Sequence, residues 1–217
     1  TPLEVINLSK SYNNNEAVKN ISFKINKNEV IGILGPNGCG KTTTIGMILG
    51  LLKPTSGSVL INGKEIEVER VNLLSDLNFI SPYIELPKKL TVKQNLKVYG
   101  KLYDVKKLES KIDYLSEKLR LEGIIDKITG ELSSGQKNRV SLAKSIINDP
   151  KVLLLDEPTA SLDPETGDFV RTFLENYQNE KGASILLASH NMLEVERLCC
   201  SVLMMKQGNI VDRGSPK

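Results

Sequence analysis

The sequence predicts an α/β fold built on a mostly parallel sheet. Two short runs, residues 152–155 and 184–188, are almost wholly apolar. Such runs are typical of central parallel strands that are covered on both faces. A third apolar run, residues 30–34, ends at a glycine-rich turn and is also expected to be a buried strand. Helix-like stretches separate these runs, and this alternation favours the α/β class.

The composition is that of an ordinary globular domain. Of the 217 residues, 40% are hydrophobic and 25% are charged, which argues against a disordered or fibrous protein. Aromatic residues make up 5%, with no Trp, so a stacking surface for single-stranded nucleic acid or sugars is not expected. The net charge of +3 is too small to indicate a nucleic-acid partner.

The cysteines and the hydropathy pattern favour a soluble, intracellular protein. The chain has three cysteines, Cys39, Cys199 and Cys200, and the last two are adjacent. An odd number with an adjacent pair is not typical of a disulfide framework and fits a reducing compartment. No window approaches the roughly 18 apolar residues that a membrane span requires. A signal peptide is not expected either.

Shorter strands are expected towards both ends of the chain, and helices are expected in its middle. Alternating or apolar runs predict strands at residues 3–8, 21–25, 58–61, 202–205 and 209–211. The stretch from about residue 82 to residue 149 is rich in Lys and poor in β-branched runs. Four of its apolar side chains recur at helical spacing, namely Leu108, Ile112, Leu115 and Leu119. We therefore expect a helical insertion between strands of the α/β core.

A phosphate-binding loop is the most specific motif. Residues 35–43 read Gly-Pro-Asn-Gly-Cys-Gly-Lys-Thr-Thr and match G-x-x-x-x-G-K-[ST] between an expected strand and an expected helix. The glycines permit close approach of the backbone to phosphates, Lys41 supplies a cation, and Thr42 supplies a hydroxyl for Mg²⁺. The residues expected to bind the nucleotide here are Gly35, Asn37, Gly38, Cys39, Gly40, Lys41, Thr42 and Thr43.

Cys39 lies inside this loop. The plainest interpretation is a small residue at a variable position of the motif. A helix N-terminus can nevertheless lower the pKa of a thiol. We therefore expect Cys39 to be alkylatable and to be shielded by bound ATP.

Two adjacent carboxylates follow the buried strand at residues 152–155. Asp156 is expected to hold Mg²⁺ through water, and Glu157 is expected to take a proton from the attacking water. The dry end of a strand favours the raised pKa that such a base needs. A lone pair of acids at a strand end is otherwise often a helix cap, but here it accompanies a phosphate-binding loop.

Three further motifs accompany these two. Residues 132–136 read Leu-Ser-Ser-Gly-Gln, residues 161–163 read Ser-Leu-Asp, and Ser-His follows the next apolar strand. Their order and spacing resemble the nucleotide-binding domains of ATP-binding cassette (ABC) transporters over essentially the whole chain. The resemblance implies a single domain with a P-loop NTPase core, a small antiparallel β-subdomain and an inserted helical subdomain. The core and β-subdomain would occupy residues 1–81 and 150–217, and the helical subdomain residues 82–149.

The resemblance also assigns roles to single residues. Tyr12 would stack on the adenine ring, although a surface Tyr in a loop is the alternative. His190, the single histidine of the chain, would sense the γ-phosphate and orient the attacking water, beside the catalytic Lys41 and Glu157.

Further residues would meet a second subunit. Ser133, Ser134, Gly135 and Gln136 would form the signature that contacts the γ-phosphate bound on that subunit. Their Ser-x-x-Gln pattern is also a capping box, and both interpretations can hold. Asp163 would contact the partner across the dimer, or it could cap the helix that begins at Pro164.

Two positions depart from the family pattern. A Gln is usual where the core meets the helical subdomain, but counting back from Leu90 places Pro82 there. Pro82 has neither a side-chain oxygen nor a backbone N–H. Ser81 could supply a hydroxyl if the register slips by one residue. The signature carries Ser134 where Gly is usual, and we expect activity to survive this small change.

The resemblance implies the ATPase subunit of an ABC transporter, most like those of exporters. ATP and Mg²⁺ would lie between two copies arranged head to tail, in a homodimer or a heterodimer. The pair would drive a separate transmembrane permease subunit from the cytoplasmic face of the cell membrane. One alternative is a non-transport ABC ATPase acting in translation, repair or metal-cluster assembly. Another is a nucleotide-binding regulator with little catalysis, which is favoured by Pro82 but not by Glu157 and His190.

Overall fold

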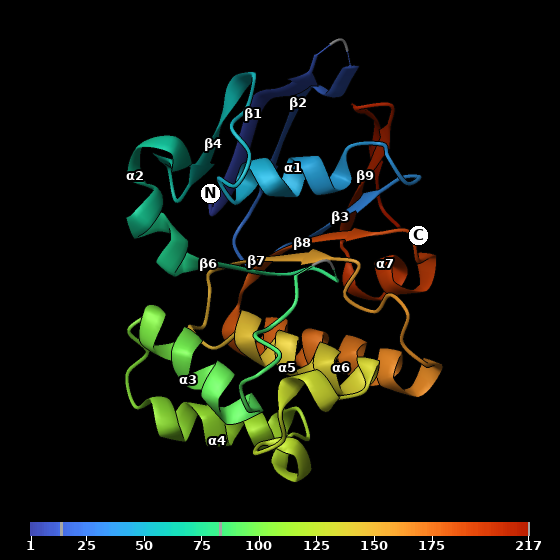
Figure 1. Ribbon diagram of the computed structural model, residues 1–217. Helices are drawn as coiled ribbons and strands as arrows, with labels where there is room; N and C mark the ends of the chain where they lie inside the picture. Colours follow the sequence, from blue (N-terminus) through green and yellow to red (C-terminus); the bar gives the residue numbers. More distant parts are fainter. Residues whose placement is uncertain (14, 83, 217) are drawn as a thin grey trace.

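Two β-sheets and a set of helices form the layers of the molecule (Figure 1). The structure is a computed structural model and describes residues 1–13, 15–82 and 84–216. The larger sheet has the strand order β10-β9-β3-β8-β7-β6, and the smaller has the order β2-β1-β4-β5. Their bounds are β1 Leu3–Tyr12, β2 Asn15–Ile25, β3 Val30–Leu34, β4 Ser56–Ile61, β5 Lys64–Glu65, β6 Leu77–Ile80, β7 Val152–Asp156, β8 Ser184–Ser189, β9 Ser201–Lys206 and β10 Asn209–Gly214.

The larger sheet is mostly parallel, as the sequence predicts. β9, β3, β8, β7 and β6 pair in parallel, and β10 is antiparallel to β9. In the smaller sheet β1 pairs antiparallel with β2 and β4, and β4 pairs antiparallel with β5. The α/β class with a parallel-dominated sheet and a small antiparallel sheet is therefore confirmed.

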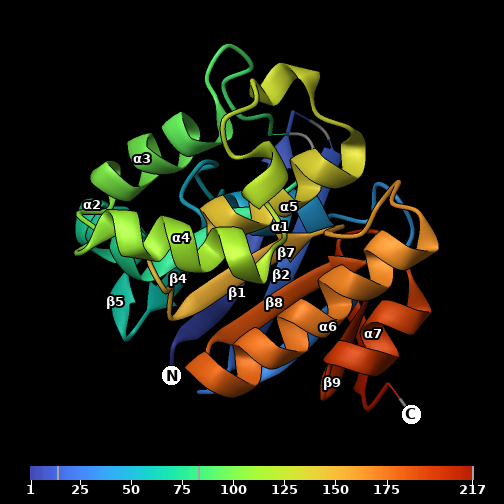
Figure 2. The same cartoon turned by 90° about the horizontal axis from the view of Figure 1, so that it is seen from below.

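Helices cover both faces of the larger sheet. α1 lies between the two sheets, and Figure 2 shows α4 and α6 in front of the strands when the molecule is seen from below. The helix bounds are α1 Lys41–Ile48, α2 Ile66–Leu73, α3 Val92–Leu102, α4 Leu108–Lys118, α5 Ser134–Ser145, α6 Pro164–Lys181 and α7 Met192–Leu198. Three 3-10 turns add Leu74–Asp76, Glu122–Ile124 and Thr129–Glu131.

The central strands separate two hydrophobic cores, which explains their wholly apolar sequences. Along β7, Leu153 and Leu155 pack into the core beneath the sheet, whereas Val152 and Leu154 pack into the core beside α1. Side chains of a strand alternate between its two faces, so a strand with a core on each side needs apolar residues throughout. Because β3, β8 and β7 are parallel neighbours, their carboxyl ends meet at one edge of the sheet.

Some elements are longer than the sequence predicts, and others are not predicted by it. The strands expected at 3–8, 21–25 and 58–61 are present but longer, and α4 confirms the helix expected from its apolar spacing. α2 and β6 were not predicted. Residues 84–149 contain α3, α4 and α5, together with an isolated bridge between Thr91 and Ile128.

Capping residues set where the helices of this segment begin. Thr91 and Gln94 form a capping box at the start of α3, in which each side chain accepts a backbone N–H. Such a box satisfies two donors that a helix N-terminus leaves without partners. In the described ranges, no helix is both long and apolar enough to cross a bilayer.

A buried lysine joins α5 to β6. Lys144 is 8% exposed, and its Nζ donates to Asn78 Oδ1 at 3.2 Å and lies 4.6 Å from the centre of the Phe79 ring. Burial lowers the pKa of its ammonium group to about 8. The folded state therefore binds fewer protons than the unfolded chain between about pH 8 and the ordinary lysine pKa of about 10.4. Stability contributed by this group consequently rises with pH across that window.

We expect Lys144→Met to show this linkage directly. At pH 7 the wild type carries a desolvation cost of roughly 3 kcal/mol at this site, partly offset by the contacts with the Phe79 and Tyr99 rings. The variant should therefore be more stable at pH 7, by about 1–2 kcal/mol, and its advantage should shrink towards pH 10. Urea denaturation of both proteins across this range measures the difference. An advantage that does not change with pH would contradict the account.

Candidate active site

The phosphate-binding loop joins β3 to α1. Gly38 and Gly40 have φ of 79° and 112°, values that residues with a Cβ rarely adopt. At Gly35 the limit is space, because an added Cβ would lie 2.2 Å from Met205 O and 2.7 Å from Cys39 Sγ. The sequence Gly-x-x-Gly-x-Gly therefore follows from the close packing of this loop against β9 and from two left-handed backbone positions.

Lys41 begins α1 and lies folded over the loop. It is 6% exposed, and its Nζ donates to Gly35 O at 2.6 Å and to Pro36 O at 3.2 Å. The first turn of α1 carries no acidic residue, so the positive end of the helix dipole is not neutralised there. A cation, a helix N-terminus and exposed Asn37 and Gly38 together suit an anion such as a phosphate.

The expectation that Cys39 is alkylatable is wrong for the folded protein. Its side chain is 3% exposed and belongs to the hydrophobic core beside α1. Its backbone N–H donates to Pro36 O at 3.2 Å within the loop. The small side chain packs into this core, so it is not open to a thiol reagent in the folded protein.

Asp156 lies at the end of β7 beside the start of α1. Its Oδ2 accepts from Thr42 Oγ1 at 3.3 Å and from Ser81 Oγ at 3.4 Å. Asp156 is 2% exposed, and desolvation raises its pKa above the ordinary value, against the lowering effect of the hydrogen bond from Thr42. A buried carboxylate beside hydroxyl groups is the all-oxygen donor set that Mg²⁺ prefers. The residues present therefore fit a magnesium ion.

Glu157 and His190 form a close pair next to this carboxylate. His190 Nδ1 lies 2.7 Å from Glu157 Oε1, and the two side chains are 64% and 13% exposed. Glu157 has a φ of 49°, and its backbone N–H donates to Ala188 O at 2.8 Å. A left-handed residue directly after a strand redirects the chain, and strained positions of this kind cluster at functional sites. The pair thus brings together the ends of β7 and β8.

A buried acid behind His190 escaped the sequence analysis. Ser189 Oγ donates to Glu194 Oε2 at 2.6 Å and accepts the N–H of Asn191 at 3.0 Å, so it braces the turn that carries His190. Glu194 is fully buried, and desolvation raises its pKa. α7 is too short for its hydrophobic periodicity to reveal a buried acid. Glu194 is a positioning residue, since it acts through Ser189.

The predicted signature forms the start of α5. Ser133 Oγ accepts from the N–H of Gln136 at 3.3 Å, and Gln136 Oε1 accepts from the N–H of Ser133 at 3.0 Å, so the capping box is present. Ser133 and Ser134 are exposed, while Gly135 and Gln136 are half-buried. The first turn of α5 carries no acid. This N-terminus therefore faces outward with its dipole unopposed.

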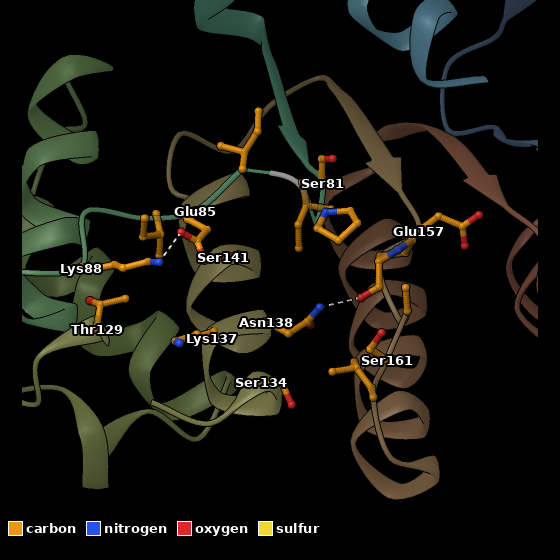
Figure 3. Close-up of a pocket in the computed structure, with 17 residues that line it drawn as sticks. Ser81, Glu85, Lys88, Thr129, Ser134, Lys137, Asn138, Ser141, Glu157 and Ser161 are labelled. Atoms are coloured by element: carbon orange, nitrogen blue, oxygen red, sulfur yellow. Dashed lines mark hydrogen bonds and ion pairs between the residues drawn. The ribbon is translucent and has the colours of Figure 1, made fainter. Parts of the chain in front are cut away.

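A pocket connects the signature helix to the carboxylate strand (Figure 3). It lies between the chain that follows β6, the side of α5 and the loop that follows β7, and it is lined by Ser81, Pro82, Ser134, Asn138 and Glu157 among others. Asn138 Nδ2 donates to Pro158 O at 2.7 Å across it. Asn138 is not among the residues that the sequence predicts, because a contact between α5 and the loop after β7 leaves no local sequence pattern.

The remaining predicted residues lie at the start of α6, at the end of β1, in the first turn of α1 and after β6. Asp163 Oδ1 accepts the N–H of Thr166 at 2.9 Å and caps α6, and this backbone hydrogen bond lowers its pKa. Tyr12 is 45% exposed at the end of β1, not in a loop, and Lys10 Nζ lies 5.0 Å from its ring centre. Thr43 is half-buried in the first turn of α1. Pro82 lies in a turn after β6 and is exposed.

Comparisons with known proteins agree with this geometry. The family model described as ABC transporter matches residues 18–160. The chain is 33% identical over 218 residues to the Nod factor export ATP-binding protein I of Rhizobium etli, with 100% of this chain and 69% of that protein covered. These findings support a transporter ATPase and not the non-transport alternative.

Solved structures give the same picture. The structure of cbiO1 from Clostridium perfringens, described as part of the ABC transporter complex cbiONQ, has a TM-score of 0.86 and 34% identity over 100% of this chain and 89% of that one. A dimeric structure of MJ0796, a bacterial ABC transporter cassette, has a TM-score of 0.90 and 25% identity over 99% of each chain. The phosphate-binding loop, the paired carboxylates, the fold and these relatives together place the chain in the ABC transporter family, as an ATP-binding subunit with ATPase activity.

Proposed function

We propose that this chain hydrolyses Mg-ATP at the carboxyl edge of its larger sheet and thereby drives an exporter. The observation that carries the proposal is the convergence of four segments there, namely the start of α1 and the ends of β6, β7 and β8. Thr42 and Ser81 share one oxygen of Asp156, and Glu157, the next residue, contacts His190. Binding sites of α/β folds are expected at the carboxyl ends of parallel strands, which is where these side chains meet.

Each side chain has a distinct task in this proposal. Lys41 exchanges its two carbonyl partners for phosphate oxygens, and Thr42 and Asp156 hold the magnesium ion. When bound, Mg²⁺ neutralises negative charge on the phosphate oxygens. Glu157 accepts the proton of the attacking water. His190 contacts the Glu157 carboxylate, senses the γ-phosphate and orients the attacking water.

The site is complete only with a second copy in this proposal. The start of α5 points outward, capped by Ser133 and free of acidic residues in its first turn, and so suits a phosphate presented by another molecule. Ser134, Gly135 and Gln136 belong to the same surface. Asp163 would contact the partner subunit while it caps α6, and Tyr12 would stack on the adenine. The dimeric assembly of the MJ0796 relative supports this arrangement.

The motor would act on a separate transmembrane permease subunit at the cytoplasmic face of the cell membrane. Support comes from the relatives, since one is described as an export ATP-binding protein and another as part of a transporter complex. Purification of the tagged chain from detergent-solubilised membranes tests this assignment. We expect a permease-type membrane protein to co-purify; recovery with ribosomes or DNA would contradict it.

We expect Pro82→Gln to raise ATP turnover or to lower the Mg²⁺ concentration needed for half-maximal turnover. The family resemblance implies a Gln here that helps to hold Mg²⁺, and the proline ring has no oxygen that could take its place. Steady-state hydrolysis measured over a range of Mg²⁺ concentrations checks the result. If neither the turnover nor the Mg²⁺ requirement changes, the absence of a Gln side chain at position 82 does not limit this protein.

A further inference from the structure

Ser81 lies next to the metal-binding carboxylate because of the register between β6 and β7. The strands are parallel neighbours in which Ile80, the last residue of β6, pairs with Leu155, so the residues that follow this pair, Ser81 and Asp156, lie side by side. Ile80 and Leu155 both pack into the core beneath the sheet. Side chains alternate along a strand, so Ser81 and Asp156 face the opposite side, towards Thr42. The contact therefore results from the fold.

Two hydroxyl groups share one oxygen of that carboxylate. Ser81 Oγ lies 3.4 Å and Thr42 Oγ1 lies 3.3 Å from the same atom, Asp156 Oδ2. A hydroxyl has one hydrogen and two lone pairs, so each group can donate to Asp156 and still offer a lone pair to a cation. The oxygen donors of Thr42, Ser81 and Asp156 thus meet from the start of α1, the residue after β6 and the end of β7.

We propose that Ser81 supplies the magnesium ligand that Pro82 lacks. Pro82 follows in the turn and lines the pocket beside α5, and its ring carries no oxygen or nitrogen donor. The ligand position thus moves from residue 82 to residue 81, next to the end of β6. The parallel register of β6 and β7 holds Ser81 against Asp156. This inference rests on the proposed Mg-ATP site and adds a ligand to it. The alternative is that Ser81 only hydrogen-bonds to Asp156 and does not touch the cation.

The test measures binding, not turnover. ATP binding is followed with the Glu157→Gln protein, so that nucleotide is not consumed, over a range of free Mg²⁺ concentrations. Adding Ser81→Ala should raise the Mg²⁺ concentration for half-maximal ATP binding about tenfold. A loss of metal affinity of about this size is usual when a residue that supports a metal site is mutated. Binding without Mg²⁺ should not change. Ser141→Ala removes a hydroxyl from α5 in the same pocket and should leave the Mg²⁺ requirement as it was.

A second variant separates direct ligation from a structural role. Ser81→Cys keeps the size of the side chain but replaces a hard oxygen by a soft sulfur, which disfavours Mg²⁺ and favours Cd²⁺. We expect this variant to need more Mg²⁺ and less Cd²⁺ than the parent for ATP binding. The parent measured with Cd²⁺ controls for the exposed thiol of Cys200.

The outcomes distinguish this inference from the proposed function. If the parent binds ATP with Mg²⁺ and both Ser81 variants keep its metal requirement and preference, Ser81 is not a ligand and the inference is overturned. If the parent binds no ATP, or binds it without regard to Mg²⁺, the proposed site itself fails.

Discussion

Glu157→Gln should abolish ATP hydrolysis while ATP binding persists. A Gln is nearly isosteric with Glu but cannot accept a proton, so the expected loss of turnover is about 10²–10⁴-fold, the usual contribution of a general base. The contact with His190 can survive through the amide oxygen, since Glu157 Oε1 and His190 Nδ1 are only 2.7 Å apart. Phosphate release and equilibrium binding of ATP measure the two properties separately.

The same variant should accumulate as an ATP-bound dimer, because hydrolysis is the step that separates the subunits in this account. Light scattering with and without Mg-ATP gives the mass. Glu196→Gln is a matched control, since it makes the same change at an exposed carboxylate of α7. A monomeric Glu157→Gln protein with the turnover of the wild type would remove Glu157 from the mechanism.

Gly35→Ala should both destabilise the fold and eliminate nucleotide binding. The added Cβ would lie 2.2 Å from Met205 O and 2.7 Å from Cys39 Sγ, so a backbone carbonyl of β9 or the whole loop must move. Overpacking of this kind costs typically 1–3 kcal/mol and more when backbone must shift, so we expect a loss of about 3 kcal/mol or more. Displacement of the loop also moves Gly35 O and Pro36 O, which hold Lys41.

Urea denaturation and binding of a fluorescent ATP analogue check the two effects. Gly123→Ala is the control, because no atom beyond its chain neighbours lies within 4 Å of a Cβ added there. It should leave both quantities within the range of an ordinary surface substitution, about 0.5 kcal/mol. A Gly35→Ala protein with normal stability and normal nucleotide binding would show that β9 does not confine the loop.

The parts of the site that the sequence predicts are those carried by local, dense patterns. The phosphate-binding loop, Asp156 and Glu157 lie within short motifs at the ends of apolar strands, and the structure brings Thr42 and Asp156 together from segments 114 residues apart. The central strands were predictable because a core on each face leaves them no polar positions.

Other features depend on contacts between distant segments and leave no local pattern. β6 has only the sequence Leu-Asn-Phe-Ile and is defined by its pairing with β7. Cys39 looks accessible in a glycine-rich loop, yet the packing of that loop against the core buries it. Glu194 is a buried acid whose partner, Ser189, precedes its own helix. Each required the tertiary structure.

The central claim is that ATP is held between the loop of one copy and the signature of another, and cross-linking tests it most directly. Asn37 and Ser134 are exposed on these two surfaces, and Cys200 is the one exposed thiol among the described residues. In a Cys200→Ser, Glu157→Gln background, the variants Asn37→Cys and Ser134→Cys are mixed with Mg-ATP and a short bifunctional thiol reagent.

We predict a covalent dimer in the mixture with Mg-ATP, and none when either variant is treated alone or when ATP is left out. In the proposed head-to-tail dimer each loop would lie opposite the partner's signature, so only unlike cysteines would meet. Cross-linking of Asn37→Cys to itself, or a mixture that stays monomeric while it binds Mg-ATP, would contradict the account.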